Sequence, residues 1–205
     1  MNELLAVAAI TMLAVISPGP DFAMVTRNSY AYGRRSGLMA ALGIACGVQV
    51  HVLYTVLGIA LVITHSPMVF MAMKLLGAGY LIYLGWKSLS STSALEVGVA
   101  SGPRPSAGKA FGMGFLTNAL NPKTMLFVVA TYSQVVQVSN GLATDLGYGL
   151  FMSLAHWGWF SVVAVFFSAE ALRGRLLARQ RVLDRVIGAA LIGLGMGLAL
   201  AGWGR

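Results

Sequence analysis

The sequence predicts an all-α membrane protein with six transmembrane helices, arranged as two inverted three-helix repeats in which the first and fourth helices are broken. Composition is one observation behind this fold class, because 58% of the 205 residues are hydrophobic and only 10% are charged. A soluble domain usually carries about a quarter charged residues, so the bilayer has to be the solvent. Six apolar stretches also have the roughly 20 residues that a spanning helix needs, and two of these stretches contain a polar break with proline.

The six stretches follow one another along the whole chain. A bilayer requires backbone polar groups to be satisfied within each segment, and strand-type alternation is absent, so we expect helices. The expected helices are Leu4–Tyr32 (broken), Leu38–Ile63, Met68–Trp86, Ala110–Val136 (broken), Leu146–Ser168 and Val186–Trp203. The residues before the first apolar run include Glu3 and no Lys or Arg, so a cleavable signal peptide is not expected there.

The first break is a five-residue polar element within an apolar segment. It comprises Ser17, Pro18, Gly19, Pro20 and Asp21. Proline lacks a backbone N–H and clashes with the preceding turn, and glycine adds backbone freedom, so a regular helix cannot continue here. A carboxylate at such a break is costly in an apolar environment, and we therefore interpret the element as part of a transport site.

The second break occupies the corresponding place in the second half of the chain. It contains Asn118, Asn121, Pro122 and Lys123, and Pro122 lies 102 residues after Pro20. Each half has three segments, and because three is odd the second half must be inverted relative to the first. We expect one transporter domain over residues 1–205, with halves at 1–87 and 109–205 and a polar linker at 88–108.

The orientation follows from the distribution of Lys and Arg. Basic residues cluster in the first, third and fifth connections, at Arg27, Arg34, Arg35, Lys87, Arg104, Lys109, Arg173, Arg175, Arg179, Arg181 and Arg185. The second and fourth connections contain none, so the odd connections are expected in the cytoplasm and both termini outside. The net charge of +8 does not gather on one face, which argues against nucleic-acid binding and favours topology and attraction to anionic lipid.

Asp21 and Lys123 are the strongest candidates for the site, because each follows a proline inside an interrupted segment. A salt bridge between them is one interpretation. In a second, the broken helix ends hold a zwitterion, with Lys123 attracting its carboxylate and Asp21 receiving its ammonium. In a third, Asp21 carries the coupling proton. Ser17, Asn118 and Asn121 can either cap freed backbone groups or bind the substrate.

Three further polar residues interrupt apolar runs. Gln49, His51 and His156 could line a cavity, although hydrogen bonding to a neighbouring helix is the commoner role. His51, His156 and Cys46 lack metal-ligand spacing, so we expect neither a metal nor a cofactor. The single cysteine excludes an internal disulfide or a thiol-pair redox centre. Neither GxSxG nor HExxH occurs, so we do not expect an enzyme.

Glycine pairs spaced four residues apart allow helices to approach closely. These pairs are Gly43 and Gly47, Gly108 and Gly112, and Gly193 and Gly197. We expect them to pack within the chain, with a homo-oligomer interface as their alternative use.

Several motifs together resemble the LysE/RhtB amino-acid exporters. They are SPGPDFAMV (Ser17–Val25), GRRSG (Gly33–Gly37), LGIACG (Leu42–Gly47), KLLGAGYLIYLGWK (Lys74–Lys87) and LTNALNPKTMLF (Leu116–Phe127). The resemblance covers nearly the whole chain, and it looks most like the threonine-efflux branch. It implies a bacterial inner-membrane exporter of small, threonine- or homoserine-like amino acids, driven by the proton gradient. An exporter of leucine, lysine, another small metabolite or an ion is the alternative.

Overall fold

The structure, a computed structural model, is entirely helical in the residues that it describes. These are residues 2–90, 103–135, 141–169, 182, 185–197 and 199–200. They form α1 (Asn2–Ile16), α2 (Pro20–Tyr32), α3 (Arg34–His65), α4 (Pro67–Leu89), α5 (Ala107–Ala119), α6 (Pro122–Val135) and α7 (Leu142–Ser168), followed by an apolar helix at Arg185–Gly197. The predicted all-α class is thereby confirmed.

Two helices are long and apolar enough to cross a membrane within this part of the chain. They are Arg34–Gly58 and Leu142–Ser168, and the bent pair α1–α2 provides a third candidate if it counts as one span. The six-span arrangement stays a prediction. The centre of the expected linker (91–102), the arginines between 173 and 181 and the end of the sixth segment at Trp203 lie outside the described residues.

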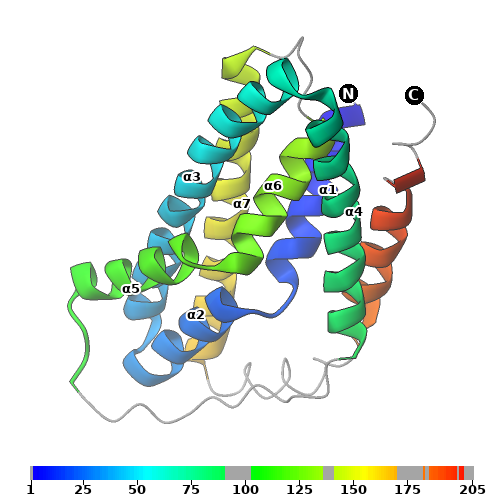
Figure 1. The fold of residues 1–205 in the computed structure, drawn as a ribbon. Helices are drawn as coiled ribbons and strands as arrows, with labels where there is room; N and C mark the ends of the chain where they lie inside the picture. Colours follow the sequence, from blue (N-terminus) through cyan, green and yellow to red (C-terminus); the bar gives the residue numbers. More distant parts are fainter. Residues whose placement is uncertain are drawn as a thin grey trace.

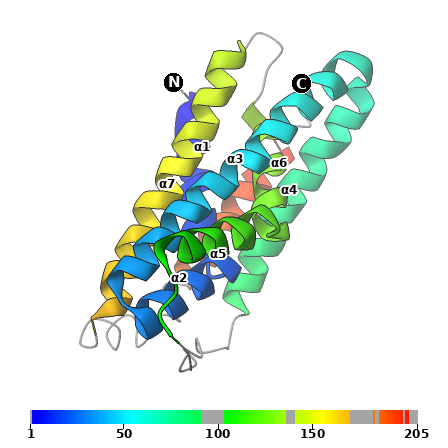
Figure 2. The same ribbon diagram turned by 90° about the vertical axis from the view of Figure 1, so that its left-hand side faces the viewer.

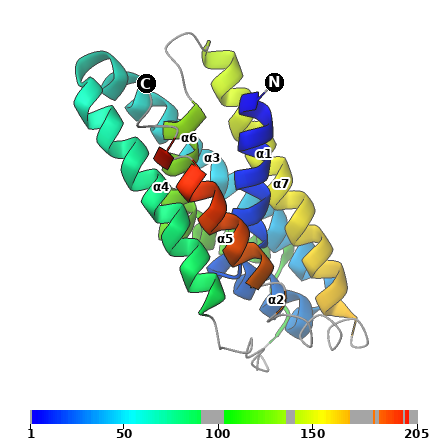
Figure 3. The ribbon, with the colours of Figure 1, turned by 90° about the vertical axis from the view of Figure 1, so that its right-hand side faces the viewer.

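The long helices form a bundle whose outer surface is apolar. Helices α3 and α7 pack together along much of their length, and α5 crosses α3 (Figures 1 and 2). On another side of the bundle, α4 lies beside the helix Arg185–Gly197 (Figure 3), where Gly85 and Gly188 bring the two backbones together. Large side chains such as Leu57 and Leu150 are exposed. An exposed apolar surface of this kind suits lipid rather than water.

Close glycine packing occurs at only one of the three pairs singled out from the sequence. A Cβ atom built on Gly43 would lie 2.0 Å from the Phe111 carbonyl oxygen, and one on Gly47 would lie 2.9 Å from Asn118 Cβ. The expectation is wrong for the other two pairs, because an added Cβ at Gly108, Gly112, Gly193 or Gly197 meets no described atom within 4 Å. The expectation fails for these four glycines because their spacing does not determine which side of the helix meets a neighbour.

Two apolar clusters form the interior, and the breaks lie where they meet. One cluster contains Val7, Ile10 and Ala14 of α1 together with Phe127 of α6. The second begins at the next residue of α1, Val15, and gathers apolar residues of α2, α3 and α7. The polar side chains Ser17, Asp21 and Asn121 are buried there, whereas Pro20 and Pro122 of the same breaks are exposed.

Candidate functional site

The first break separates α1 from α2 and bends the chain by 54°. Helix α1 ends at Ile16, and α2 begins with Pro20 at its first position, where the missing N–H costs no hydrogen bond. Gly19 precedes it in an extended conformation, without a side chain that could cap α2. The turn therefore leaves backbone carbonyls at the end of α1 without helical partners.

The second break separates α5 from α6 and carries its own cap. Asn121 accepts a hydrogen bond from the Lys123 N–H at 3.0 Å through its side-chain oxygen, which makes it the N-cap of α6. The Asn121 N–H in turn donates to the Asn118 carbonyl at 2.8 Å. Capping, one of the two roles considered for Asn121, is thus the role its side chain has in this structure.

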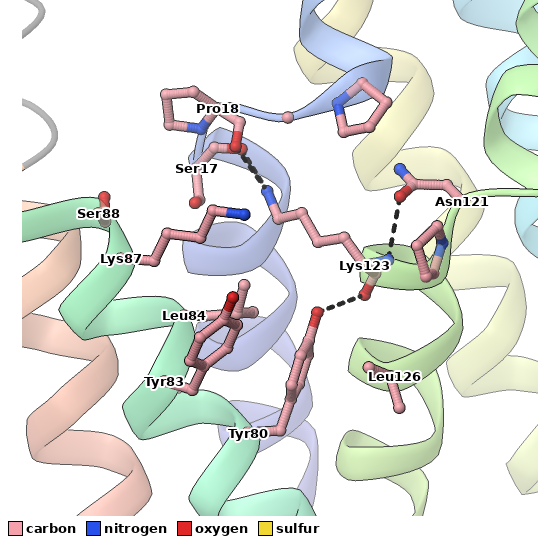
Figure 4. A pocket seen from close by; sticks show the side chains of 13 residues that line it. Ser17, Pro18, Tyr80, Tyr83, Leu84, Lys87, Ser88, Asn121, Lys123 and Leu126 are labelled. Atoms are coloured by element: carbon pink, nitrogen blue, oxygen red, sulfur yellow. Dashed lines mark hydrogen bonds between the residues drawn. The ribbon is translucent and has the colours of Figure 1, made fainter. Parts of the chain in front are cut away.

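Lys123 reaches from the second break to the first. Its ammonium donates to the Ser17 carbonyl at 2.5 Å and to the Pro18 carbonyl at 3.3 Å (Figure 4). A cation at the carboxyl end of α1 is favoured by the helix dipole. Gly19 allows this approach, because an added Cβ there would lie 3.1 Å from Lys123 Cδ. Lys123 therefore supplies hydrogen bonds that the first break lacks.

Asp21 makes the opposite connection, from the first break to the second. Its Oδ2 accepts hydrogen bonds from the Asn118 amide at 2.8 Å and from the Thr124 hydroxyl at 3.3 Å. The residue is only 6% exposed, and its Oδ1 is buried without a hydrogen-bond partner. Asp21 and Lys123 form no ion pair in this structure, because each is bonded to other groups of the opposite break.

A cavity of about 350 Å³ opens beside the two breaks. It is lined by Ser17, Pro18, Gly19, Pro20, Tyr80, Tyr83, Leu84, Lys87, Ser88, Asn121, Pro122, Lys123 and Leu126 (Figure 4). Lys87 and Lys123 both extend into this space, from α4 and α6 (Figure 4). The Tyr80 hydroxyl fixes the start of α6 by donating to the Lys123 carbonyl at 3.2 Å. Two ammonium groups at one cavity favour an anionic ligand group.

The contribution of α4 to this cavity is the part of the site that the sequence analysis missed. The distribution of basic residues indicates only a topological role for Lys87, and the sequence motifs assign no role to Tyr80, Tyr83 or Leu84 individually. A signal was present, because these four residues are spaced i, i+3, i+4 and i+7 and so share one face of a helix. That face presents two hydroxyls and one ammonium to the breaks.

A second, smaller cavity of about 20 Å³ lies next to the first, with room for roughly one water molecule. Ser17, Gly19, Asn121 and Lys123 line both cavities, whereas Asp21, Thr124 and His156 line only the small one. The buried ring of His156 bonds the Met152 carbonyl through Nδ1 at 2.7 Å. Because a carbonyl only accepts, Nδ1 carries the proton and a neutral ring keeps a lone pair on Nε2.

Gln49 and His51 connect neighbouring helices. The Gln49 amide donates to the Gly149 carbonyl at 3.0 Å and to the Ser153 hydroxyl at 2.6 Å. His51 Nε2 bonds the Asn118 carbonyl at 2.8 Å, and its Nδ1 bonds the Tyr54 hydroxyl at 2.7 Å. These contacts match the interhelical role considered for both residues, and His51 braces the residue that donates to Asp21.

Known proteins similar to this chain include uncharacterized membrane proteins and threonine efflux proteins. The family model described as LysE type translocator matches residues 12–202. The uncharacterized membrane protein YrhP of Bacillus subtilis is 31% identical over 98% of this chain and 100% of its own length. A threonine efflux protein of Salmonella typhi is 30% identical over 95% of this chain and 96% of its own. A threonine efflux protein of Escherichia coli K12 is 30% identical over 96% of this chain and 97% of its own length. No solved structure matches the chain.

Proposed function

The chain belongs to the LysE type translocator family, and we propose that it is a secondary exporter of small, threonine- or homoserine-like amino acids in the bacterial inner membrane. Family membership supports a transporter in a membrane rather than an enzyme. Two relatives named threonine efflux protein, each about 30% identical along nearly their whole length, support the choice of substrate.

The observation that carries this proposal is the meeting of two broken helices at a cavity with two ammonium groups. A cavity of about 350 Å³ falls at the lower end of the range for small-ligand sites, about 300–1,000 Å³. The substrate carboxylate binds to Lys123 and Lys87, and the Tyr80 and Tyr83 hydroxyls are available for further hydrogen bonds. Two cations also disfavour a cationic substrate such as lysine, one of the alternatives considered from the sequence.

The substrate ammonium requires acceptors, and the first break provides them. In this structure the Ser17 and Pro18 carbonyls accept hydrogen bonds from the Lys123 ammonium. When the substrate carboxylate draws Lys123 toward the cavity, these two carbonyls are released and accept hydrogen bonds from the substrate ammonium. The exchange replaces one ammonium group by another, so the first break remains satisfied throughout.

Asp21 is assigned to proton coupling in this proposal. Its buried Oδ1 has no partner and its Oδ2 is already bonded to Asn118 and Thr124, so a proton on Oδ1 leaves the existing bonds intact. Movement of Lys123 also displaces one of the side chains that line both cavities, and it thereby widens the connection between Asp21 and the substrate space. Substrate binding and access of protons to Asp21 are linked through this one residue.

The proposed architecture has six spans, formed by the inverted halves 1–87 and 109–205, with the linker 88–108 in the cytoplasm and both termini outside. The two breaks form corresponding elements of the halves and meet near the middle of the membrane, as in transporters built from inverted repeats. Their reciprocal hydrogen bonds, Asp21 to the second break and Lys123 to the first, support this arrangement.

Proteoliposomes loaded with a panel of amino acids test the function directly. Under an imposed pH gradient, threonine and homoserine should leave faster than leucine and lysine, and collapsing the gradient should slow their efflux. Protein-free liposomes measure leakage. Efflux of lysine alone, or rates independent of the gradient, would contradict the substrate assignment or the coupling, respectively.

A further inference from the structure

A third cavity lies away from the breaks, where the starts of α3 and α5 come together. Its volume is about 290 Å³. It is lined by Arg35, Ser36, Arg104, Pro105, Ser106 and Ala107, and it shares no residue with the two cavities described above. The transport mechanism assigns no role to any of these residues, so the cavity requires a separate explanation.

Ser36 is the residue that indicates a ligand. It is only 3% exposed, and its hydroxyl oxygen is buried without any hydrogen-bond partner, although the residue lines the cavity. Buried hydroxyl groups are normally hydrogen-bonded, because leaving one unpaired is costly. A bound acceptor in the cavity would provide the missing partner, since the hydroxyl can donate its proton.

The surroundings of Ser36 favour a negatively charged acceptor. Arg35 and Arg104 approach from the start of α3 and from the segment before α5, and neither guanidinium has an ion pair or hydrogen bond with any described residue. Helix α5 also begins at the cavity wall with Ala107. Its N-cap Ser106 accepts only from the Lys109 N–H, at 3.3 Å, so the first two N–H groups of α5 are free of side-chain caps.

We propose that this cavity binds a phosphate group, held by the two guanidinium groups, the Ser36 hydroxyl and the start of α5. Arginine forks and helix N-termini are both suited to phosphate oxygens. The phosphate can belong to an anionic lipid headgroup or to free inorganic phosphate. The predicted topology places the cavity at the cytoplasmic surface, where both occur.

Binding is tested on the purified full chain with two probes. In detergent, short-chain phosphatidylglycerol is titrated and the fraction carrying one lipid is measured by native mass spectrometry, with phosphatidylcholine as the neutral comparison. In phosphatidylcholine nanodiscs, inorganic phosphate is titrated and the rise in unfolding temperature is recorded. Saturable binding of phosphatidylglycerol alone identifies a lipid headgroup, and saturable binding of both identifies the phosphate group as sufficient.

Matched variants separate a site from general charge attraction. Arg35→Ala and Arg104→Ala should each weaken binding by about tenfold or more, since each removes a charge-assisted pair. Ser36→Ala should weaken it by roughly threefold to tenfold while leaving the stability of the unliganded protein unchanged or higher. Arg34→Ala removes the same charge one residue away from the cavity lining and should change affinity by less than about twofold. Equal losses for Arg34→Ala and Arg35→Ala, or no saturable binding of either probe, would overturn the proposal.

Discussion

In each helix break a charged residue follows a proline, yet the two breaks hold these charged residues in different ways. Asp21 of the first break is buried among side chains, bonded to an amide and a hydroxyl, with one carboxylate oxygen unpaired. The ammonium of Lys123 in the second break bonds only to backbone carbonyls and lies at the wall of a cavity of about 350 Å³. The Asp21 carboxylate, which has one unpaired oxygen, is suited to accept a proton. The Lys123 ammonium is suited to exchange with a substrate, because its carbonyl partners can accept hydrogen bonds from another ammonium group instead.

The two breaks are connected by hydrogen bonds and not by a salt bridge. Each charged residue satisfies groups of the opposite break, so the two helix pairs are connected twice through separate bonds. A direct ion pair between Asp21 and Lys123 would neutralise both groups and leave neither for the substrate. In the observed arrangement the two charged groups have different hydrogen-bond partners, and of the two only Lys123 also lines the larger cavity.

The largest effect is expected for Asp21→Asn, which tests whether the Asp21 carboxyl group carries the coupling proton. Asparagine retains an oxygen that can accept from Asn118 and Thr124, but it cannot take up a proton. Export should fall by at least about 100-fold, because the proton-carrying group is removed and a positioned acid–base group typically contributes about 10²-fold or more. Threonine tolerance of expressing cells and efflux from preloaded cells measure the change.

Asp145→Asn is the control for that variant, because Asp145 is also a buried carboxylate but lines neither cavity at the breaks. It should retain export if it inserts normally. Wild-type tolerance in cells with normal amounts of the Asp21→Asn protein would remove Asp21 from the coupling mechanism.

Lys123→Ala tests the proposed exchange of Lys123 between the first break and the substrate. It should lower export by about tenfold to 100-fold, since it removes a charged hydrogen-bond donor from the site. The double variant with Asp21→Ala distinguishes the observed bonding from a salt bridge. Because Lys123 and Asp21 have different partners, the double variant should be no more active than either single variant. Recovery of efflux in the double variant, measured in proteoliposomes, would instead show that the two residues form a pair during transport.

Lys87→Gln tests whether the substrate binds in the larger cavity, which is lined by both Lys87 and Lys123. Lys87 is exposed and holds no bond within the breaks, so its loss should weaken carboxylate binding without preventing turnover. The KM for threonine efflux should rise by about threefold to tenfold, with the maximal rate changed by less than about twofold. Lys109→Gln, which removes an exposed lysine outside the cavity, is the matched control. A lower maximal rate at unchanged KM would place Lys87 outside substrate binding.

The smallest effect is expected for Gly19→Ala, which tests the close approach of Lys123 to the first break. The added methyl would lie 3.1 Å from Lys123 Cδ and 3.3 Å from Nζ, and this flexible side chain can move by a few tenths of an ångström. Stability should fall by less than about 1 kcal/mol, because no backbone atom has to shift. Thermal unfolding measures this, with Gly112→Ala as the control in open space. A loss as large as that of a core substitution would mean that Lys123 is held rigidly.

Some features of the site were predictable because they depend on neighbours in the sequence. Proline and glycine act on the backbone within a few residues, so the ends of the four short helices at the breaks followed from the local sequence. Asn121 was among the capping candidates for the same reason, since its side chain bonds the N–H two residues later. The helix face of α4 that carries Lys87 could equally be predicted from its i, i+3, i+4 and i+7 spacing. The distribution of basic residues, however, indicates only a topological role for Lys87.

The membrane setting, the helical class and the positions of both breaks could all be predicted from the sequence, because composition and backbone sterics act locally. Tertiary structure decided which groups the breaks bring together: Lys123 bonds the Ser17 carbonyl 106 positions away, and Asn118 donates to Asp21 97 positions away. Tertiary structure also sets which glycines pack closely and that Ser36 is among the residues lining a cavity. Such contacts depend on the rotation and register of whole helices, which many weak packing interactions set jointly and no short stretch of sequence encodes.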